Sequence, residues 1–190
     1  MTTIYFKKHS NRKSEKVFFN YLMSLYSDII HVDENYLLDS HYIDKHISTT
    51  RILKFINKST FISDKKKAIA FEVLSKLPQN IKVAKEISDL SIDYVIKDKN
   101  HLTFIEFHEK QHYRLSDYRL RPIFTTDNER REIPRFLQRL MRDIWRWENL
   151  RNFKIVWHNW FDKNQKTLVK FHKDQNEEFV LPNKFSISDG

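Results

Sequence analysis

Residues 91–108, SIDYVIKDKNHLTFIEFH, carry the clearest structural pattern in the chain. Two alternating runs, rich in β-branched and aromatic residues, flank Lys99-Asn100 and predict a β-hairpin with a short turn. With a two-residue turn, Asp93 lies directly opposite Glu106. Opposed residues point to the same face of a sheet, so this register places two carboxylates side by side.

The paired acids need a physical explanation, because like charges opposite one another destabilise a sheet. A divalent cation relieves that repulsion, and hard ions such as Mg²⁺ prefer carboxylate oxygens. His108 and Lys110 lie further along the Glu106 strand and on the same face, since strand side chains alternate. The alternative is a pair of solvated acids on an exposed hairpin face.

Read from His108, residues 108–112 also spell H-E-x-x-H, the signature of zinc peptidases. That motif requires a helix, because both histidines must project from one face. Glu132 lies at a spacing suited to a third zinc ligand. However, residues 102–107 alternate as a strand does, and charged residues surround the histidines. The zinc peptidase is therefore a minor alternative.

Composition limits the function further. The chain has 190 residues, of which 40% are hydrophobic, which predicts one folded domain over residues 1–190. It contains no cysteine, which excludes thiol catalysis and cysteine zinc sites. Its one glycine is Gly190, so neither a P-loop nor a dinucleotide fingerprint is present and no nucleotide cofactor is expected. The formal net charge of +9 favours a polyanionic partner.

No apolar targeting or membrane segment is evident, so we expect a cytoplasmic protein without a membrane partner. The region 1–58 is predicted to be largely helical, including a helix over 14–30. A helix over 64–77, capped by Ser63, precedes a strand over 81–87. A helix over 133–149 precedes a strand over 153–159.

The 133–149 helix has two distinct faces. The predicted apolar stripe consists of Ile133, Phe136, Leu137, Leu140, Ile144 and Trp147. Arginines recur at helical spacing on another face, at Arg135, Arg139, Arg142 and Arg146. An Arg139–Asp143 ion pair on a solvated face is the simpler interpretation of that stripe.

Asp93, twelve further residues, and then Glu106-Phe107-His108 resemble the motif of the PD-(D/E)xK nucleases. The order of elements over about residues 60–160 is similar to the αβββαβ core of that superfamily. The resemblance implies an α/β fold, with a mixed central sheet flanked by helices. The chain looks most like a small type II restriction endonuclease. It departs from the motif at Ile92, where the proline stands, and at His108, where the lysine stands.

By this resemblance, Asp93, Glu106 and the backbone carbonyl of Phe107 would bind Mg²⁺, for which Mn²⁺ can substitute. His108 or Lys110 would orient or activate the attacking water. The expected activity is site-specific hydrolysis of double-stranded DNA by a homodimer. A junction or repair nuclease, and a DNA-binding module without catalysis, remain alternatives.

DNA contacts are expected from an arginine-rich region, because arginine and asparagine suit phosphates and base edges. The segment 113–132 is predicted to be a long recognition loop. The candidate DNA-binding residues are Arg114, Arg119, Arg121, Asn128, Arg130, Arg131, Arg135 and Arg139.

Overall fold

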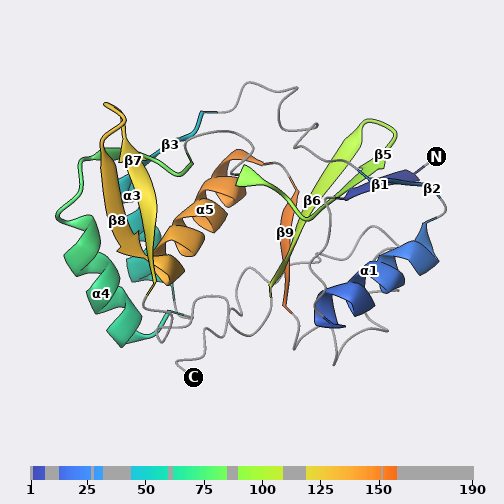
Figure 1. The fold of residues 1–190 in the computed structure, drawn as a ribbon, viewed down its shortest axis with the longest axis horizontal. Coiled ribbons are helices and arrows are strands. Elements are labelled where there is room, and N and C mark those ends of the chain that lie inside the picture. The colour runs from blue at the N-terminus through green and yellow to red at the C-terminus, as the bar shows by residue number, and fades with distance from the viewer. Residues whose placement is uncertain are drawn as a thin grey trace. The chain divides into compact units, whose positions relative to one another are not determined.

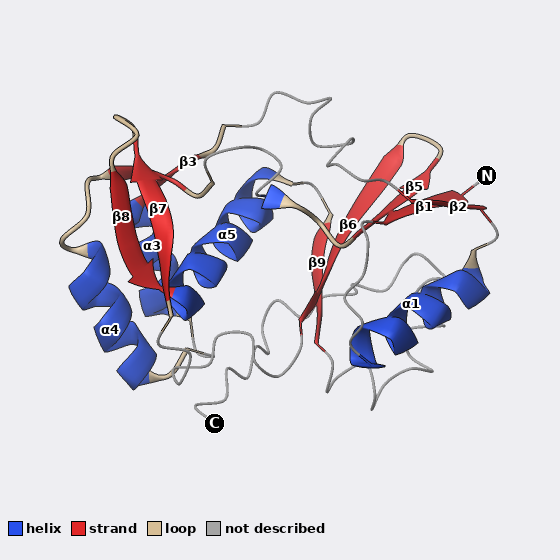
Figure 2. Ribbon diagram, viewed as in Figure 1, coloured by secondary structure: helices blue, strands red, loops and turns tan. Residues whose placement is uncertain are grey.

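The computed structural model describes residues 2–6, 13–26, 28–31, 44–59, 62–84, 90–108, 119–150 and 152–157. The described residues form two compact units, drawn in Figure 1. The first unit contains the described residues before 37, from 91 to 108 and from 150 onward. The second contains those from 44 to 90 and from 119 to 149. Both units mix helices and strands, as the sequence predicts for an α/β chain (Figure 2).

The first unit is built on a five-stranded mixed sheet of order β2-β1-β5-β6-β9. Its strands are β1 (Thr2–Phe6), β2 (Asp28–His31), β5 (Tyr94–Asp98), β6 (His101–His108) and β9 (Phe153–Trp157). β1 runs parallel to β2 and β6 runs parallel to β9, while the remaining pairs are antiparallel. The sheet therefore combines a central hairpin with strands from both sides of it in the sequence.

Helix α1 (Lys13–Leu25) packs on one face of this sheet through apolar side chains. The Phe18 ring stacks on Phe107 with a centroid distance of 4.8 Å and meets Tyr94 edge-on at 5.4 Å. Such offset and edge-to-face pairs add to the stabilisation from buried area. The core of the unit comprises Ile4, Phe18, Leu22, Tyr94, Ile96, Ile105, Phe107 and Val156.

The register of the β5–β6 hairpin is confirmed. The described pairs run from Asp98 opposite His101 to Tyr94 opposite Ile105, around a two-residue turn. Lys99 takes a φ of 52°, in the left-handed region that tight hairpin turns require. Lysine is an unusual residue in this region, but the alternation of the two strands specifies the register without help from the turn.

The second unit has a four-stranded antiparallel sheet of order β3-β4-β7-β8. Its strands are β3 (His46–Ser48), β4 (Asn80–Lys82), β7 (Leu120–Thr125) and β8 (Arg130–Pro134). The helices are α3 (Thr49–Lys58), α4 (Asp64–Leu74) and α5 (Arg135–Asn149). α5 packs against β7 and β8, and α3 packs against β3, α4 and α5. The buried isoleucines of the sheet are Ile47, Ile81, Ile123 and Ile133.

The expected nuclease core over residues 60–160 is wrong in its membership. The strand expected over 81–87 is β4, Asn80–Lys82, and it pairs with β3 and β7. The neighbour of β5 is instead β1, from the start of the chain. The region 1–58 is therefore not simply helical, and the helix expected over 14–30 ends at Leu25 before β2 begins. Ser63 caps α4 as predicted, but that helix ends at Leu74.

The predictions for residues 113–149 also need correction. The described part of the expected recognition loop forms the β7–β8 hairpin. Pro134 is the last residue of β8. The helix α5 therefore begins at Arg135 and not, as predicted, at residue 133. Trp145 is the fully buried tryptophan and Trp147 is exposed. Arg146 is buried as well, where an exposed basic face was expected.

Candidate active site

Asp93 lies directly before β5 and contacts the backbone of β6. Its carboxylate Oδ2 accepts a hydrogen bond from the Phe107 N–H at 2.8 Å. This bond extends the hairpin beyond Tyr94–Ile105, the last described pair of the ladder. It holds the Asp93 carboxylate beside the peptide that joins Glu106 to Phe107. The structure thus brings the two predicted acids to neighbouring strands.

The Phe107 carbonyl is directed toward the same strand edge as its N–H. In an antiparallel ladder, the N–H and C=O of one residue point to the same side of the strand. Because the N–H reaches Asp93, the carbonyl also faces the β5 side of β6. Two carboxylates and one backbone carbonyl are therefore carried by one short segment of the hairpin.

Glu106 and His108 are buried on the sheet face opposite the α1 core. Glu106 is 7% exposed and His108 is 2% exposed. Ile155 of β9 lies beside Glu106 in the ladder, and it too is buried. Placing a carboxylate in such surroundings is costly unless a charge or hydrogen bonds compensate it. The alternative of two solvated acids therefore does not hold for Glu106.

Tyr94 feels the charges of three acids, of which Glu15 on α1 was not predicted from the sequence. Tyr94 is 1% exposed, and its buried hydroxyl has no hydrogen-bond partner among the described residues. Burial raises the pKa of this phenol well above its ordinary value, and the charges of Asp93, Glu15 and Glu106 raise it further. Glu15 lies in the first turn of α1, one turn before Phe18, which contacts Tyr94. Residues three apart on a helix lie on one face, so the spacing of Glu15 and Phe18 was the sequence feature that could have indicated Glu15.

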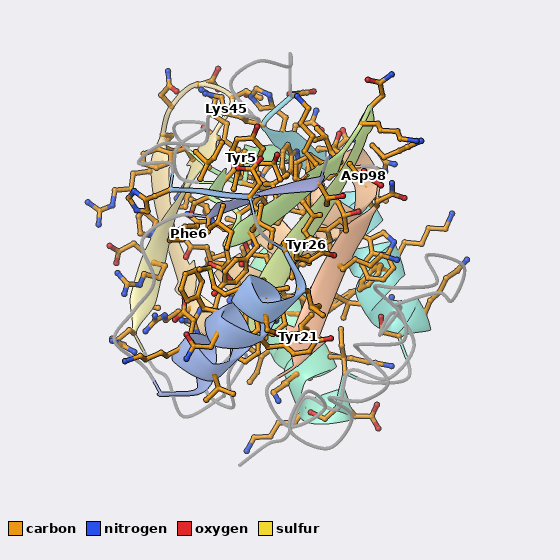
Figure 3. The ribbon with its side chains drawn as sticks, turned by 90° about the vertical axis from the view of Figure 1, so that its right-hand side faces the viewer. Tyr5, Phe6, Tyr21, Tyr26, Lys45 and Asp98 are labelled. Carbon is orange, nitrogen blue, oxygen red and sulfur yellow. The ribbon has the colours of Figure 1, made fainter. Side chains whose placement is uncertain are left out.

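Two further tyrosines have raised pKa values in this unit. Burial raises the pKa of Tyr21 above its ordinary value, and the nearby Tyr26 adds to the effect. Burial raises the pKa of Tyr26 to about 12, with a contribution from Asp98. Tyr21, on α1, and Tyr26, directly after it, are labelled in Figure 3 together with Asp98 at the end of β5. Asp98 also accepts a hydrogen bond from the Thr2 hydroxyl at 3.0 Å.

The donor set suits a hard divalent cation in its chemistry. Magnesium sites commonly use only one or two carboxylates and retain several waters. Asp93, Glu106 and the Phe107 carbonyl supply oxygen ligands of this kind. Within the described ranges, no three His, Asp or Glu side chains are arranged to hold a metal ion together. The site is therefore a carboxylate pair rather than a complete ligand cage.

Two of the expected site residues, Lys110 and Arg114, lie outside the described residues. The remainder of the H-E-x-x-H motif, residues 109–112, lies outside them too. His108 is the last residue of strand β6, whereas the zinc-peptidase signature needs it on a helix. This placement disfavours the peptidase alternative.

The other candidate DNA-binding residues belong to the second unit. Arg119 and Arg121 lie before and within β7, and Arg135 and Arg139 lie on α5. Arg130 pairs with Glu132 at 2.8 Å, and Arg131 pairs with Glu129 at 2.8 Å. Both pairs are exposed, so each contributes little to stability and its arginine can exchange partners.

Asn128 has a structural role in addition to its expected one. It closes the β7–β8 turn in a left-handed conformation, with a φ of 63°. Asparagine tolerates this region better than most residues. Its side-chain oxygen also accepts a hydrogen bond from the Lys82 ammonium. The turn residue thus links β4 to the tip of the neighbouring hairpin.

Two arginines of α5 stabilise the unit from within. Arg142 donates to the Val83 carbonyl at 3.2 Å, and Arg146 donates to the Leu90 carbonyl at 3.3 Å. Asp143 accepts from Arg146 at 2.8 Å, an ion pair that the sequence analysis did not propose. Part of the arginine stripe therefore binds backbone carbonyls of the same unit, at Val83 and Leu90.

Among the described helices, none is long and apolar enough to cross a membrane. No known protein family, curated protein or solved structure matches this chain.

Proposed function

We propose that the protein is a Mg²⁺-dependent endonuclease that hydrolyses double-stranded DNA at specific sequences. The observation that supports this proposal best is the hydrogen bond from the Phe107 N–H to Asp93. It holds one acid beside the peptide of the other, and a bound cation would relieve the repulsion between the two charges. The burial of Glu106 supports the same conclusion.

In this proposal, Asp93, Glu106 and the Phe107 carbonyl hold the ion, and Mn²⁺ fits the same oxygen ligands. When bound, the ion would neutralise charge on the phosphate and lower the pKa of a coordinated water. His108 lies two residues after Glu106 on the same face, where its imidazole would orient the attacking water or accept its proton. Lys110 remains the alternative residue for this role.

DNA binding is proposed for the arginine-rich second unit. The net charge of +9 attracts a polyanion, and the exposed Arg119, Arg130 and Arg131 supply cations at its surface. A homodimer is proposed because cutting both strands of a symmetric site requires two active centres. A cytoplasmic location belongs to the same proposal.

A DNA-binding module without catalysis is the second candidate. It is favoured because, among the described residues, no three His, Asp or Glu side chains could hold a metal ion together. It is also favoured by His108, which stands where a lysine occurs in the motif that this sequence resembles.

One cleavage experiment separates these functions. Long duplex DNA is incubated with protein and Mg²⁺, with EDTA, and with the variants Asp93→Asn and Asp98→Asn. Asp98 is the matched control, because it is an acid at the far end of the same strand. The proposal expects discrete fragments that EDTA and Asp93→Asn abolish and Asp98→Asn retains.

Other outcomes select the alternatives. Cleavage of branched DNA, with linear duplex left intact, would identify a junction nuclease. Binding without cleavage in both Mg²⁺ and Mn²⁺ would favour the binding module. Cleavage that persists in Asp93→Asn would refute the assigned site.

A further inference from the structure

A cation–aromatic–cation row crosses three strands of the second sheet. Lys82 of β4 lies directly opposite Phe124 of β7, and Phe124 lies directly opposite Arg130 of β8. Directly opposed residues share a face, so these three side chains stand in one line. Neighbouring strands are about 4.8 Å apart, so the two outer strands lie roughly 10 Å apart.

This row lies on the open face of the sheet. The alternate residues Ile81, Ile123 and Ile133 are buried on the other face. On the row's face, Leu120 is 55% exposed, and Arg130 and Glu132 are exposed as well. Figure 2 shows the β7–β8 hairpin with α3 behind it. Phe124 and Lys82 are themselves half-buried, so part of the ring is accessible on this face and the ring is not in the buried core.

The polar groups around the ring are held by weak, exchangeable contacts. The Lys82 ammonium donates to the Asn128 side-chain oxygen at the hairpin turn. Arg130 pairs with Glu132, which lies two residues away on the same face. An exposed pair of this type contributes roughly 0–1 kcal/mol, so a phosphate can compete with the carboxylate. Glu132 is an acid on this face and opposes binding of a polyanion.

We propose that Lys82, Phe124 and Arg130 form a binding site for an unpaired nucleotide of a nucleic acid. The base stacks on the Phe124 ring, and the flanking phosphates contact Lys82 and Arg130. Aromatic side chains on an open sheet, flanked by cations, bind single strands in this way because every base has a π face. A duplex hides those faces, so the ring favours unpaired over paired DNA. Binding is measured without a metal, so the inference does not depend on the proposed cleavage.

The first test compares Phe124 with a matched phenylalanine elsewhere. Affinity for a fluorescein-labelled single-stranded oligonucleotide and for its duplex is measured by anisotropy in EDTA. Phe124→Leu is expected to weaken single-strand binding by about tenfold, since stacking on one aromatic is worth 1–3 kcal/mol. Phe124→Tyr is expected to retain binding. Phe71→Leu is the control, because Phe71 is 56% exposed on α4.

The second test concerns the cations and does not disturb an apolar side chain. Lys82→Gln and Arg130→Gln are each expected to lower the slope of log K against log salt by about 0.7 for single strands. Lys76→Gln is the control, because Lys76 is an exposed lysine just after α4 that pairs with Glu72. The inference is overturned if Phe124→Leu and Phe71→Leu weaken single-strand binding equally, or if Phe124→Leu weakens single-strand and duplex binding equally. It is also overturned if Lys82→Gln and Lys76→Gln lower the salt slope equally.

Discussion

Asp93 contributes both a negative charge and a hydrogen-bond acceptor, and two substitutions separate these contributions. Asp93→Asn keeps an oxygen that can accept from the Phe107 N–H. We therefore expect its free energy of unfolding to stay within about 1 kcal/mol of the natural protein, while cleavage is lost. Asp93→Ala removes the acceptor and is expected to cost about 1–3 kcal/mol.

Urea unfolding of both variants measures the difference. The two effects are separable because the ion needs the charge, whereas the Phe107 N–H needs only an acceptor. Equal stability of the alanine and asparagine variants would show that the hydrogen bond does not contribute to folding. Full cleavage by either variant would remove Asp93 from the proposed metal site.

The buried tyrosines predict a loss of stability in alkali. Burial raises the pKa of Tyr26 from its ordinary value of 10.0 to about 12 in the folded protein. The folded state therefore keeps this proton to a higher pH than the unfolded state. The corresponding stability is fully present below pH 10 and is lost as the pH rises toward 12. Tyr21 and Tyr94 act in the same direction.

Phenolate absorbance and unfolding measured across this range test the prediction. Tyr26→Phe is expected to reduce the fall in stability between pH 10 and 12, because phenylalanine has no proton to lose. A folded protein whose tyrosines all titrate together near pH 10 would contradict it.

Single residues were predictable where the pattern was local. Asp93 and Glu106 followed from strand alternation around a short turn. Glu15 did not, because its relation to the site depends on how α1 packs against Tyr94 and Phe107. Trp147 was expected in the buried stripe but is exposed, whereas Trp145, which the predicted stripe did not include, is buried. The remaining members of the stripe on α5 are buried as predicted, so the error is confined to its last turn.

At the level of elements, the same distinction separates strand pairs that are close in sequence from pairs that are distant. The β5–β6 hairpin was predictable because its partners are neighbours in sequence. β1 was not, because Thr2–Phe6 pairs with residues about ninety positions later. A five-residue strand offers too little periodicity to be distinguished from the start of a helix. With β1 missed, β4 was assigned to the wrong sheet.

The helix caps permit a matched prediction. Ser63 caps α4 through its side chain, which accepts from the Lys66 N–H at 3.4 Å. Ser48 is the N-cap of α3, but within the described residues its side chain makes no cap hydrogen bond. Ser63→Ala is expected to lower the free energy of unfolding by about 0.5–1 kcal/mol, and Ser48→Ala by less.

Thermal or urea unfolding of the two serine variants gives the comparison. Both substitutions remove one hydroxyl at the start of a helix, so propensity effects largely cancel. If both variants lose the same free energy of unfolding, the 3.4 Å hydrogen bond of Ser63 adds nothing to the stability of α4.

For the whole molecule, the described residues divide into two compact units whose segments alternate along the chain. A single domain was expected because no glycine- or proline-rich linker interrupts the sequence. No such linker is needed, since the chain passes between the units directly after Leu90 and after Asn149. Composition cannot detect crossings of this kind, because they occur next to buried and well-anchored residues.

One of these anchors carries the last prediction. The buried Arg146 guanidinium donates to Asp143 at 2.8 Å and to the Leu90 carbonyl at 3.3 Å. Leu90 is the last residue of its segment before the chain continues to Asp93. Arg146→Met leaves the buried Asp143 without this cation and is expected to cost about 3–5 kcal/mol. Arg146→Met with Asp143→Leu removes both charges and is expected to cost much less.

Urea unfolding measures these differences, with Arg51→Met as the control. Arg51 pairs with Glu148 at 3.5 Å but is largely exposed, so its loss is expected to cost less than about 1 kcal/mol. Amide hydrogen exchange in β5 and β6 then shows whether the loss in one unit reaches the other. If Arg146→Met speeds exchange in those strands, the anchor at Leu90 stabilises the hairpin that carries Asp93. If the double variant is as unstable as Arg146→Met, the packing of Arg146, and not its ion pair with Asp143, is what stabilises the fold.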